Sequence, residues 1–283
     1  MTTNHIAPSY GLYYQDAPQQ EETQGAHTWF TRSNNVVAAI TKVTHATVLE
    51  RADNPDEYML LLPPGVHAKV TAGDASVNAA PESLTIIPPG PSRIEVTGSG
   101  HVVRVFSARC RDLAVLAPNA AVYAEPAPTV APLQDWPMPI EGYKLRNYTL
   151  AEYTDPKIFG RIFRSRNLMI NVFERKTDRR DPRKLTPHSH ADFEQISLAM
   201  EGTFIHHLRK PWGPDSAVWR EDQHVTVHSP STIVIPTDLI HTTQDIGEGV
   251  IWLVDIFGPP RMDFSAQPGV VRNAAEYPMP DKA

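Results

Sequence analysis

Residues 186–202, TPHSHADFEQISLAMEG, decide how the rest of the chain is interpreted. His188 and His190 stand one residue apart, so in an extended strand their side chains project to the same side. Two imidazoles on one side can bind a single metal ion, and Glu194 and Gln195 follow as neighbouring oxygen donors. The competing interpretation of the same residues is a polar strand end without a metal.

A third histidine completes the candidate metal site. His241 follows the strand-like run STIVI (231–235) and the turn PTD (236–238). In an antiparallel barrel two strands that are far apart in sequence can lie side by side, so His241 can reach the first two histidines. Three imidazoles and one oxygen donor leave open positions on a divalent ion. That set suits Fe(II), which we favour, and also Mn(II), Ni(II) or Zn(II).

The rest of the chain has the pattern of an all-β protein. Short runs rich in Val, Ile, Leu and Phe alternate with Pro- and Gly-containing turns over residues 28–108 and again in the second half. The 27 prolines against 15 glycines favour many turns and few long helices. The expected fold class is all-β, with two antiparallel β-barrels joined by a Pro/Ala-rich linker.

The two halves resemble each other in detail. EYMLLLPPG (57–65) matches EQISLAMEG (194–202) in length, with Glu first and Gly last, and SLTIIPPG (83–90) matches STIVIPTD (231–238). The runs that follow these prolines fall at nearly the same spacing. These matches indicate an internal duplication of one β-unit.

Only the second copy carries the histidines. Counting from the shared Gly and Pro places Arg51, Asp53 and Arg93 where the three histidines stand in the second copy. Two arginines and an aspartate cannot replace three imidazoles, so we expect the first barrel to be metal-free and structural. The alternative is a pocket that binds an anion through Arg51 and Arg93.

The chain is therefore expected to divide into five parts. They are an N-terminal arm (1–27), an N-terminal barrel without metal ligands (28–114), a linker (115–140), a metal-binding barrel (141–262) and a C-terminal tail (263–283).

The two motifs resemble those of the cupin superfamily. PRKLTPHSHADFEQISLAMEG (182–202) is similar to the first cupin motif and PTDLIHTTQD (236–245) to the second, and with the duplication the chain looks like a bicupin. The sequence departs from the family pattern at Pro182 and Asp238, where glycines are usual, and at Asp245, where asparagine is usual. The resemblance implies a metal bound by both histidines of the first motif, its acidic position and the histidine of the second.

The fourth ligand is left open between two neighbours. Gln195 has the family spacing both from His190 and from Gly202, whereas Glu194 has it only from His190. Charge favours Glu194, because a carboxylate offsets the charge of a divalent ion. Register favours Gln195, which would place Ser197 in the interior as well and leave room for a substrate. A neutral Gln195 would leave a more positive metal centre that favours anionic bidentate substrates.

Further residues are candidates for catalysis and substrate binding. His206 and His207 lie on the strand after Gly202, so one faces the interior and the other faces out. We expect His207 or Glu194 to move a proton, against the alternative of a histidine bonded only to backbone. The loop KPWGPDSAVWRED (210–222) is expected to cover the mouth of the second barrel. The candidates for the substrate pocket are Arg209, Trp212 and Ser197.

Composition excludes several classes of protein. The net charge is −6 and the pI about 6.0, with no basic stripe, so nucleic acid is not an expected partner. No apolar run is long enough to span a membrane, and the N-terminus lacks the pattern of a secretory signal. With one cysteine, Cys110, no internal disulfide can form. We expect a cytoplasmic homodimer that binds a small molecule.

These observations predict a metal-dependent bicupin enzyme that acts on a small organic substrate, enolic, phenolic or a hydroxy acid. Dioxygenase chemistry is the leading prediction, with a metal-dependent lyase or isomerase second. A non-catalytic sugar- or small-molecule-binding cupin is the alternative from a different class, and it would keep its ligand when the metal is removed.

Overall fold

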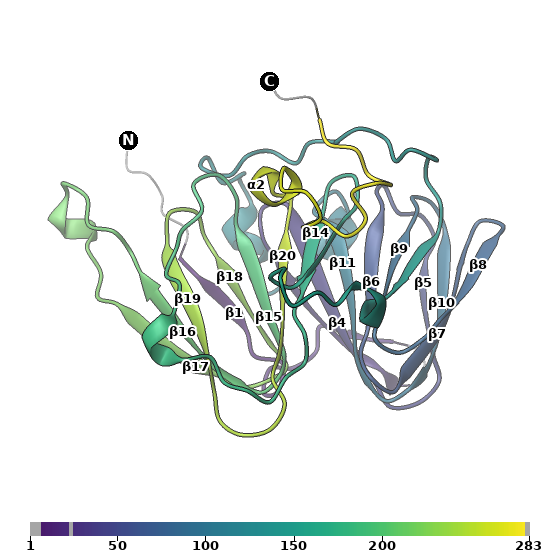
Figure 1. Ribbon diagram of the computed structural model, residues 1–283, viewed down its shortest axis with the longest axis horizontal. Helices are drawn as coiled ribbons and strands as arrows, with labels where there is room; N and C mark the ends of the chain where they lie inside the picture. Colours follow the sequence, from purple (N-terminus) through teal and green to yellow (C-terminus); the bar gives the residue numbers. More distant parts are fainter. Residues whose placement is uncertain (1–6, 23–24, 281–283) are drawn as a thin grey trace.

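The computed structural model describes residues 7–22 and 25–280, and its strands form four antiparallel sheets. Figure 1 shows the first half of the chain, in purple and blue, beside the second half, in green and yellow. The all-β prediction is therefore confirmed. Residues 1–6 and 23–24 of the expected arm, and 281–283 of the expected tail, lie outside the described residues.

The first half forms a large sheet facing a smaller one. The seven-stranded sheet has the order β12 (Arg146–Thr149), β9 (Ser83–Ile87), β6 (Tyr58–Leu62), β11 (Gly100–Ser107), β4 (Val36–Val43), β3 (His27–Arg32) and β2 (Gln20–Glu21). The four-stranded sheet has the order β5 (Thr47–Arg51), β10 (Ser92–Gly98), β7 (Val66–Ala72) and β8 (Ala75–Ala79).

The second half repeats this plan. Its six-stranded sheet has the order β1 (Ser9–Gly11), β18 (Ser231–Ile235), β15 (Gln195–Glu201), β20 (Trp252–Phe257), β14 (Met169–Val172) and β13 (Arg161–Arg164). Its three-stranded sheet has the order β17 (Gln223–Val227), β16 (Thr203–Arg209) and β19 (Ile240–Ile246). The matched sequences occupy the same places: β6 and β15 are both central, next to β9 and β18 respectively.

The two large sheets pack face to face and share one core. The position of strand β6 between the two cores explains why its sequence, YMLLL, is apolar at every position. Leu60 and Leu62 point into the interior of the first half, whereas Met59 and Leu61 point towards the second half. In the same way Ile196 on β15 belongs to the shared core. A strand that is buried on both faces loses the usual alternation of apolar and polar residues.

The two halves exchange edge strands. The segment before the first half gives a strand to the second half, and the segment before the second half gives a strand to the first. Strand β1, within the expected arm, pairs with β18 of the second half. Strand β12, within the segment assigned to the second barrel, pairs with β9 of the first half. Strand pairing therefore crosses the boundaries expected from the sequence, because these short strands complete the edge of the opposite sheet.

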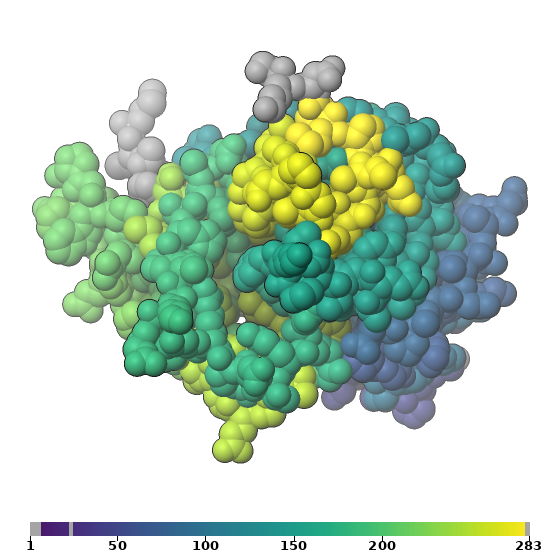
Figure 2. Space-filling view, viewed as in Figure 1, coloured from purple at the N-terminus to yellow at the C-terminus, as the bar shows by residue number. Residues whose placement is uncertain are grey.

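Helices are few and short. Those bounded within the described residues are α1 (Arg111–Ala114), α2 (Met262–Ser265) and the 3-10 turns η2 (Ala120–Tyr123), η3 (Leu150–Tyr153), η4 (Pro182–Lys184) and η5 (Ser216–Val218). None of the helices in the described part of the chain has the length and apolar character needed to cross a membrane. In Figure 2 the C-terminal segment, in yellow, lies against the teal part of the chain. The backbone N–H of Arg272 donates to the carbonyl of Ile162 at 2.7 Å.

Candidate metal centre

The two motifs meet through an isolated pair of backbone hydrogen bonds. His188 and His241 form an antiparallel bridge, with N···O distances of 3.1 and 2.8 Å, so their side chains start from neighbouring positions. The backbone N–H of Asp238 donates to the carbonyl of His190 at 2.7 Å and holds the second turn against the first motif. Asp238 has a φ of 61°, a left-handed conformation that explains why glycine is usual at this position.

The three histidines converge. One ring nitrogen from each of His188, His190 and His241 lies within 4.8 Å of the other two, so the group could hold a metal ion. The Nδ1 atoms of His188 and His241 lie 2.9 Å from the carbonyls of Thr186 and Leu239. A carbonyl only accepts, so each Nδ1 carries the proton and each Nε2 is left with a free lone pair, as metal ligation requires.

Burial keeps the imidazoles of His190 and His241 in the unprotonated form. Burial, followed by the nearby Arg261 guanidinium, lowers the pKa of His190 to about 3, and burial lowers the pKa of His241 to about 4. Both imidazoles are therefore neutral at neutral pH, which is the form that binds metals. The Nε2 atom of His241 is buried and has no hydrogen-bond partner among the described residues. A metal ion would satisfy a buried nitrogen of this kind.

Gln195 brings an amide oxygen next to this group of imidazoles. Its Oε1 lies 3.1 Å from Nε2 of His190, and its Nε2 donates to Oγ of Ser197 at 2.8 Å. The hydroxyl of Ser197 in turn donates to Oδ1 of Asp255, which fixes the direction of the amide. Nε2 of His190 and Oε1 of Gln195 are therefore the neighbouring atoms through which these two residues would hold a metal ion.

Glu194 is not part of this group, so its assignment as metal ligand and as catalytic residue is wrong. Its Oε2 accepts the backbone N–H of Asn34 at 2.6 Å, and its Oε1 accepts the hydroxyl of Tyr123 at 2.9 Å. The side chains of Glu194 and Gln195 point to opposite sides of the strand, so only one of them can face the histidines. Burial raises the pKa of Glu194 above its usual range.

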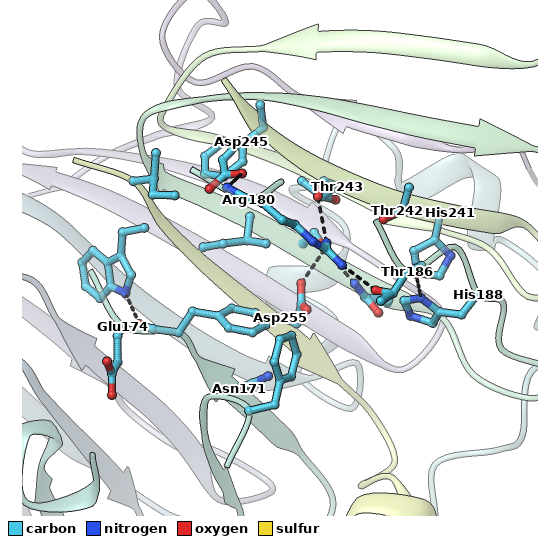
Figure 3. Close-up of a pocket in the computed structure, with 18 of the residues that line it drawn as sticks. Asn171, Glu174, Arg180, Thr186, His188, His241, Thr242, Thr243, Asp245 and Asp255 are labelled. Carbon is cyan, nitrogen blue, oxygen red and sulfur yellow. Dashed lines mark hydrogen bonds between the residues drawn. The ribbon is translucent and has the colours of Figure 1, made fainter. Parts of the chain in front are cut away.

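A cavity of about 480 Å³ opens beside the histidines. Figure 3 shows His188 and His241 at one end and Glu174 at the other, with Arg180 and Asp255 between them. The apolar walls are formed by Phe159, Phe173, Phe204, Trp252, Phe257 and Phe264.

Three cationic and three acidic side chains line the same cavity: Lys176, Arg180 and Arg261, and Glu174, Asp245 and Asp255. Arg180 donates to the carbonyl of Thr243 at 3.1 Å and to the hydroxyl of Thr186 at 2.6 Å, and it has no carboxylate partner for its guanidinium among the described residues. Arg261 is paired with Asp263 and lies against aromatic rings. Burial raises the pKa of Asp255 to about 6.

The sequence interpretation missed Arg180 and Asp255. Asp255 had a signal, because it is the one charged residue in the apolar run VIWLVDIF (250–257). A single acid on a buried strand requires a partner or a function. Arg180 had none, since it stands in the charge-rich loop KTDRRDPRK (176–184) among other arginines.

His207 faces outwards, which corrects its assignment as a catalytic residue. The buried positions of β16 are Phe204, His206 and Leu208, so His207 lies on the opposite face. There it contacts His224, with 2.7 Å between the Nδ1 atoms, and Oε1 of Gln244. His206 is the inward histidine, with Nδ1 3.0 Å from Oγ1 of Thr243, but it does not line the cavity.

Of the three residues assigned to the substrate pocket, only Ser197 lines the cavity. Arg209 is exposed and forms an ion pair with Asp222 at 2.5 Å. Trp212 is 71% exposed and stacks on Trp219 in the loop between β16 and β17. Figure 1 shows this light-green loop projecting from the end of the three-stranded sheet. The long insertion therefore does not bring its tryptophans to the cavity.

The first half offers no comparable group. The only cluster of histidine, cysteine or acidic side chains suited to a metal ion in the described part of the chain is the one in the second half. Arg51 is paired with Asp112 at 2.6 Å and the exposed Arg93 with Glu50, so neither arginine is free for the anion pocket considered above. Tyr58, at the position of Gln195, stacks on a buried phenylalanine inside the barrel.

Known proteins resemble this chain in their overall fold, although no sequence comparison finds a match. No protein-family model and no curated protein sequence matches the chain. Among solved structures, an oxalate decarboxylase from Lactobacillus farciminis in complex with formate is 13% identical with a TM-score of 0.55, covering 92% of this chain and 89% of that one. Oxalate decarboxylase from Bacillus subtilis, in a study of its Mn(II) centres, is 11% identical with a TM-score of 0.54, covering 95% and 84%.

A third similar structure is AerE from Microcystis aeruginosa, which is 8% identical with a TM-score of 0.51. The match covers 89% of this chain and 98% of AerE. At these identities the similarity concerns the fold alone. The chain therefore has the cupin fold that its two histidine motifs predicted.

Proposed function

We propose that this chain is a metal-dependent enzyme that acts on a small organic acid, with a dioxygenase reaction as the leading assignment. One observation carries the proposal. Three imidazoles and the amide oxygen of Gln195 converge at the end of a cavity that has aromatic walls and both cationic and acidic side chains, among them Arg180 and Arg261. Such a cavity has the size and mixture of apolar and convergent polar groups that small-molecule sites have.

His188, His190, Gln195 and His241 would hold the ion, and Fe(II) is the first choice because nitrogen and oxygen donors with open positions suit it. The Mn(II) centres of the B. subtilis protein make Mn(II) the second choice. When bound, the ion supplies Lewis acidity to the oxygen atoms of the substrate.

The charge of the site supports an anionic substrate. Imidazole and amide ligands carry no charge when they bind a metal ion, so none of these four residues would offset the charge of a divalent ion. Arg180 adds a second positive charge with no carboxylate partner in the described structure. An acid with a neighbouring enolic, phenolic or alcoholic oxygen would satisfy both charges. The aromatic walls would exclude water and orient the rest of the molecule.

The first experiment measures metal content and oxygen uptake. Protein purified without added metal is analysed for its elements, reconstituted separately with Fe(II) and Mn(II), and tested against enolic, phenolic and hydroxy acids. We expect a near-stoichiometric metal content and oxygen consumption that equals substrate loss. If the protein takes up neither metal, or if metal-loaded protein turns over none of these acids, the proposal is rejected.

Asp255 favours a second candidate, a metal-dependent isomerase or lyase. Its carboxyl group is buried beside the metal ligands, and burial raises its pKa to about 6, in the range where a carboxyl group can exchange a proton near neutral pH. In such a reaction Asp255 would take a proton from one carbon of the substrate and return it to another. Substrate loss that continues without oxygen would identify this candidate.

Replacing Arg180 with Gln is expected to raise KM for the acid substrate about 10-fold to about 100-fold, because a hydrogen bond to a charged group contributes about 1.5–3 kcal/mol. The metal content should not change. Arg209→Gln is the matched control, since Arg209 is an exposed arginine outside the cavity. Steady-state kinetics measure both variants. Equal KM values for the two variants would show that Arg180 does not bind the substrate.

A further inference from the structure

We propose that Tyr123 and Glu194 are positioning residues for Gln195, so that the half of the protein without the metal-binding histidines holds the metal site of the other half in shape. This inference rests on the metal site of the proposed function. We call the contact between Asn34, Tyr123 and Glu194 the Glu194 clamp.

The Glu194 clamp fixes the residue immediately before a metal ligand. Glu194 is only 3% exposed, and both of its oxygens are held by groups from outside the second half. Asn34 lies in the turn between β3 and β4, and Tyr123 closes η2 in the linker. Gln195 is the first residue of β15, so the position of Glu194 sets where the strand, and with it the amide of Gln195, begins.

The same linker also touches both loops that carry the histidines. The backbone N–H of Ala131 donates to the carbonyl of Asp192, between His190 and Gln195, at 2.7 Å. The hydroxyls of Thr129 and Thr237 lie 2.6 Å apart, in the turn that leads to His241. The linker is therefore hydrogen-bonded to each of the two loops whose meeting forms the site.

The duplication supplies an equivalent contact without a metal. Glu57 stands at the position of Glu194 in the first half. Its Oε1 accepts the hydroxyl of Tyr277 at 2.7 Å, and its Oε2 accepts the backbone N–H of Arg166 at 3.1 Å. We call this the Glu57 clamp. The turns involved are also alike, SNN (33–35) and SRN (165–167).

The two clamps are reciprocal. In each, a glutamate of one half accepts a backbone N–H from a turn of the other half. In each, it also accepts a tyrosine hydroxyl from the segment that follows the other half. Both clamps therefore join the halves. They differ in the next residue, which is the donor Gln195 after Glu194 and the core residue Tyr58 after Glu57.

A positioning effect is expected at Gln195 because its amide is a weak, neutral donor that depends on its placement. Its Oε1 reaches the site only while its Nε2 stays on Ser197. Residues that hold a ligand in place from outside the site commonly change metal affinity about 10-fold to about 100-fold when they are replaced.

The test compares Tyr123→Phe with Tyr277→Phe in the full chain, using Mn(II) as the probe. Each variant loses one hydroxyl bonded to a buried glutamate, so both should lower the unfolding temperature of the metal-free protein. Only Tyr123→Phe should raise the Mn(II) dissociation constant, by about 10-fold, and alter the electron paramagnetic resonance spectrum of bound Mn(II). Gln195→Ala gives the effect of losing the donor altogether.

The outcomes are distinguishable. The inference is overturned if both variants bind Mn(II) with the wild-type dissociation constant and spectrum. It is also overturned if Tyr123→Phe and Tyr277→Phe alter the dissociation constant and the spectrum to the same extent. In either case the Glu194 clamp is only a structural contact. If the wild-type protein itself binds neither Mn(II) nor Fe(II), the proposed function fails first and the inference fails with it.

Discussion

Replacing His241 with Ala is expected to abolish metal binding. The Nε2 atom of His241 is buried without a hydrogen-bond partner in the described structure, and its Nδ1 is fixed on the carbonyl of Leu239. The site loses one of three strong donors. Because outer residues alone change metal affinity about 10-fold to about 100-fold, the loss of a direct ligand should exceed about 100-fold. Titration of metal-free protein with Mn(II) or Fe(II) measures it.

For the metal-free protein, in contrast, the same substitution is expected to have little effect. A buried nitrogen without a partner destabilises the folded state, so its removal offsets part of the packing lost with the ring. Metal-free His241→Ala should therefore unfold close to the wild-type temperature. Added metal should stabilise only the wild type, by about 2.7 kcal/mol at 100 times the dissociation constant.

His207→Ala is the control for His241→Ala. His207 also lies in the three-stranded sheet, but on the outer face against His224. The variant His207→Ala should therefore bind metal with the wild-type affinity. Metal binding by His241→Ala at the wild-type constant would remove His241 from the site, whereas equal losses in both variants would point to a general effect on the sheet.

Much of the fold could be predicted from the sequence because it depends on local patterns. The runs YMLLL and STIVI are strands with the bounds that the sequence indicates, Tyr58–Leu62 and Ser231–Ile235. The edge strands Ser9–Gly11 and Arg146–Thr149 could not be found in this way. They are too short to show a pattern, and they are strands only because each pairs with the opposite half.

The candidate site also has a part that local sequence predicts and a part that depends on residues far away in the chain. The spacing of the motifs was enough to bring His188, His190 and His241 together. Charge favoured Glu194 as the alternative ligand, but its carboxylate accepts the backbone N–H of Asn34, which lies 160 positions away. No local pattern carries that information, whereas the count back from Gly202 carried the correct register for Gln195.

The assignment of His207 failed for a reason that the sequence did contain. Strand β16 reads TFIHHLR, and its apolar residues Phe204 and Leu208 share their parity with His206. The face that buries a phenylalanine and a leucine is the interior face. Alternation along the strand would therefore have placed His206 inside and His207 outside.

For the isomerase or lyase candidate, replacing Asp255 with Asn is expected to lower kcat about 100-fold or more while metal content stays at the wild-type level. Asparagine keeps an oxygen that can accept the hydroxyl of Ser197, so the chain from Ser197 to Gln195 is retained. It cannot carry a proton between substrate atoms. General acid or base groups commonly contribute about 10²-fold to about 10⁴-fold to the rate. Metal analysis and steady-state kinetics on the same preparation separate the two effects.

Glu174→Gln is the matched control for Asp255→Asn, because Glu174 lines the same cavity at the end away from His188 (Figure 3). It changes the charge of the cavity by the same amount without touching the metal ligands. If both variants lose kcat equally, the effect is electrostatic and Asp255 transfers no proton. If Asp255→Asn loses metal as well, Asp255 acts through Ser197 and Gln195 as part of the metal site. A loss of kcat with unchanged KM and metal, confined to Asp255→Asn, assigns the proton transfer to this carboxyl group.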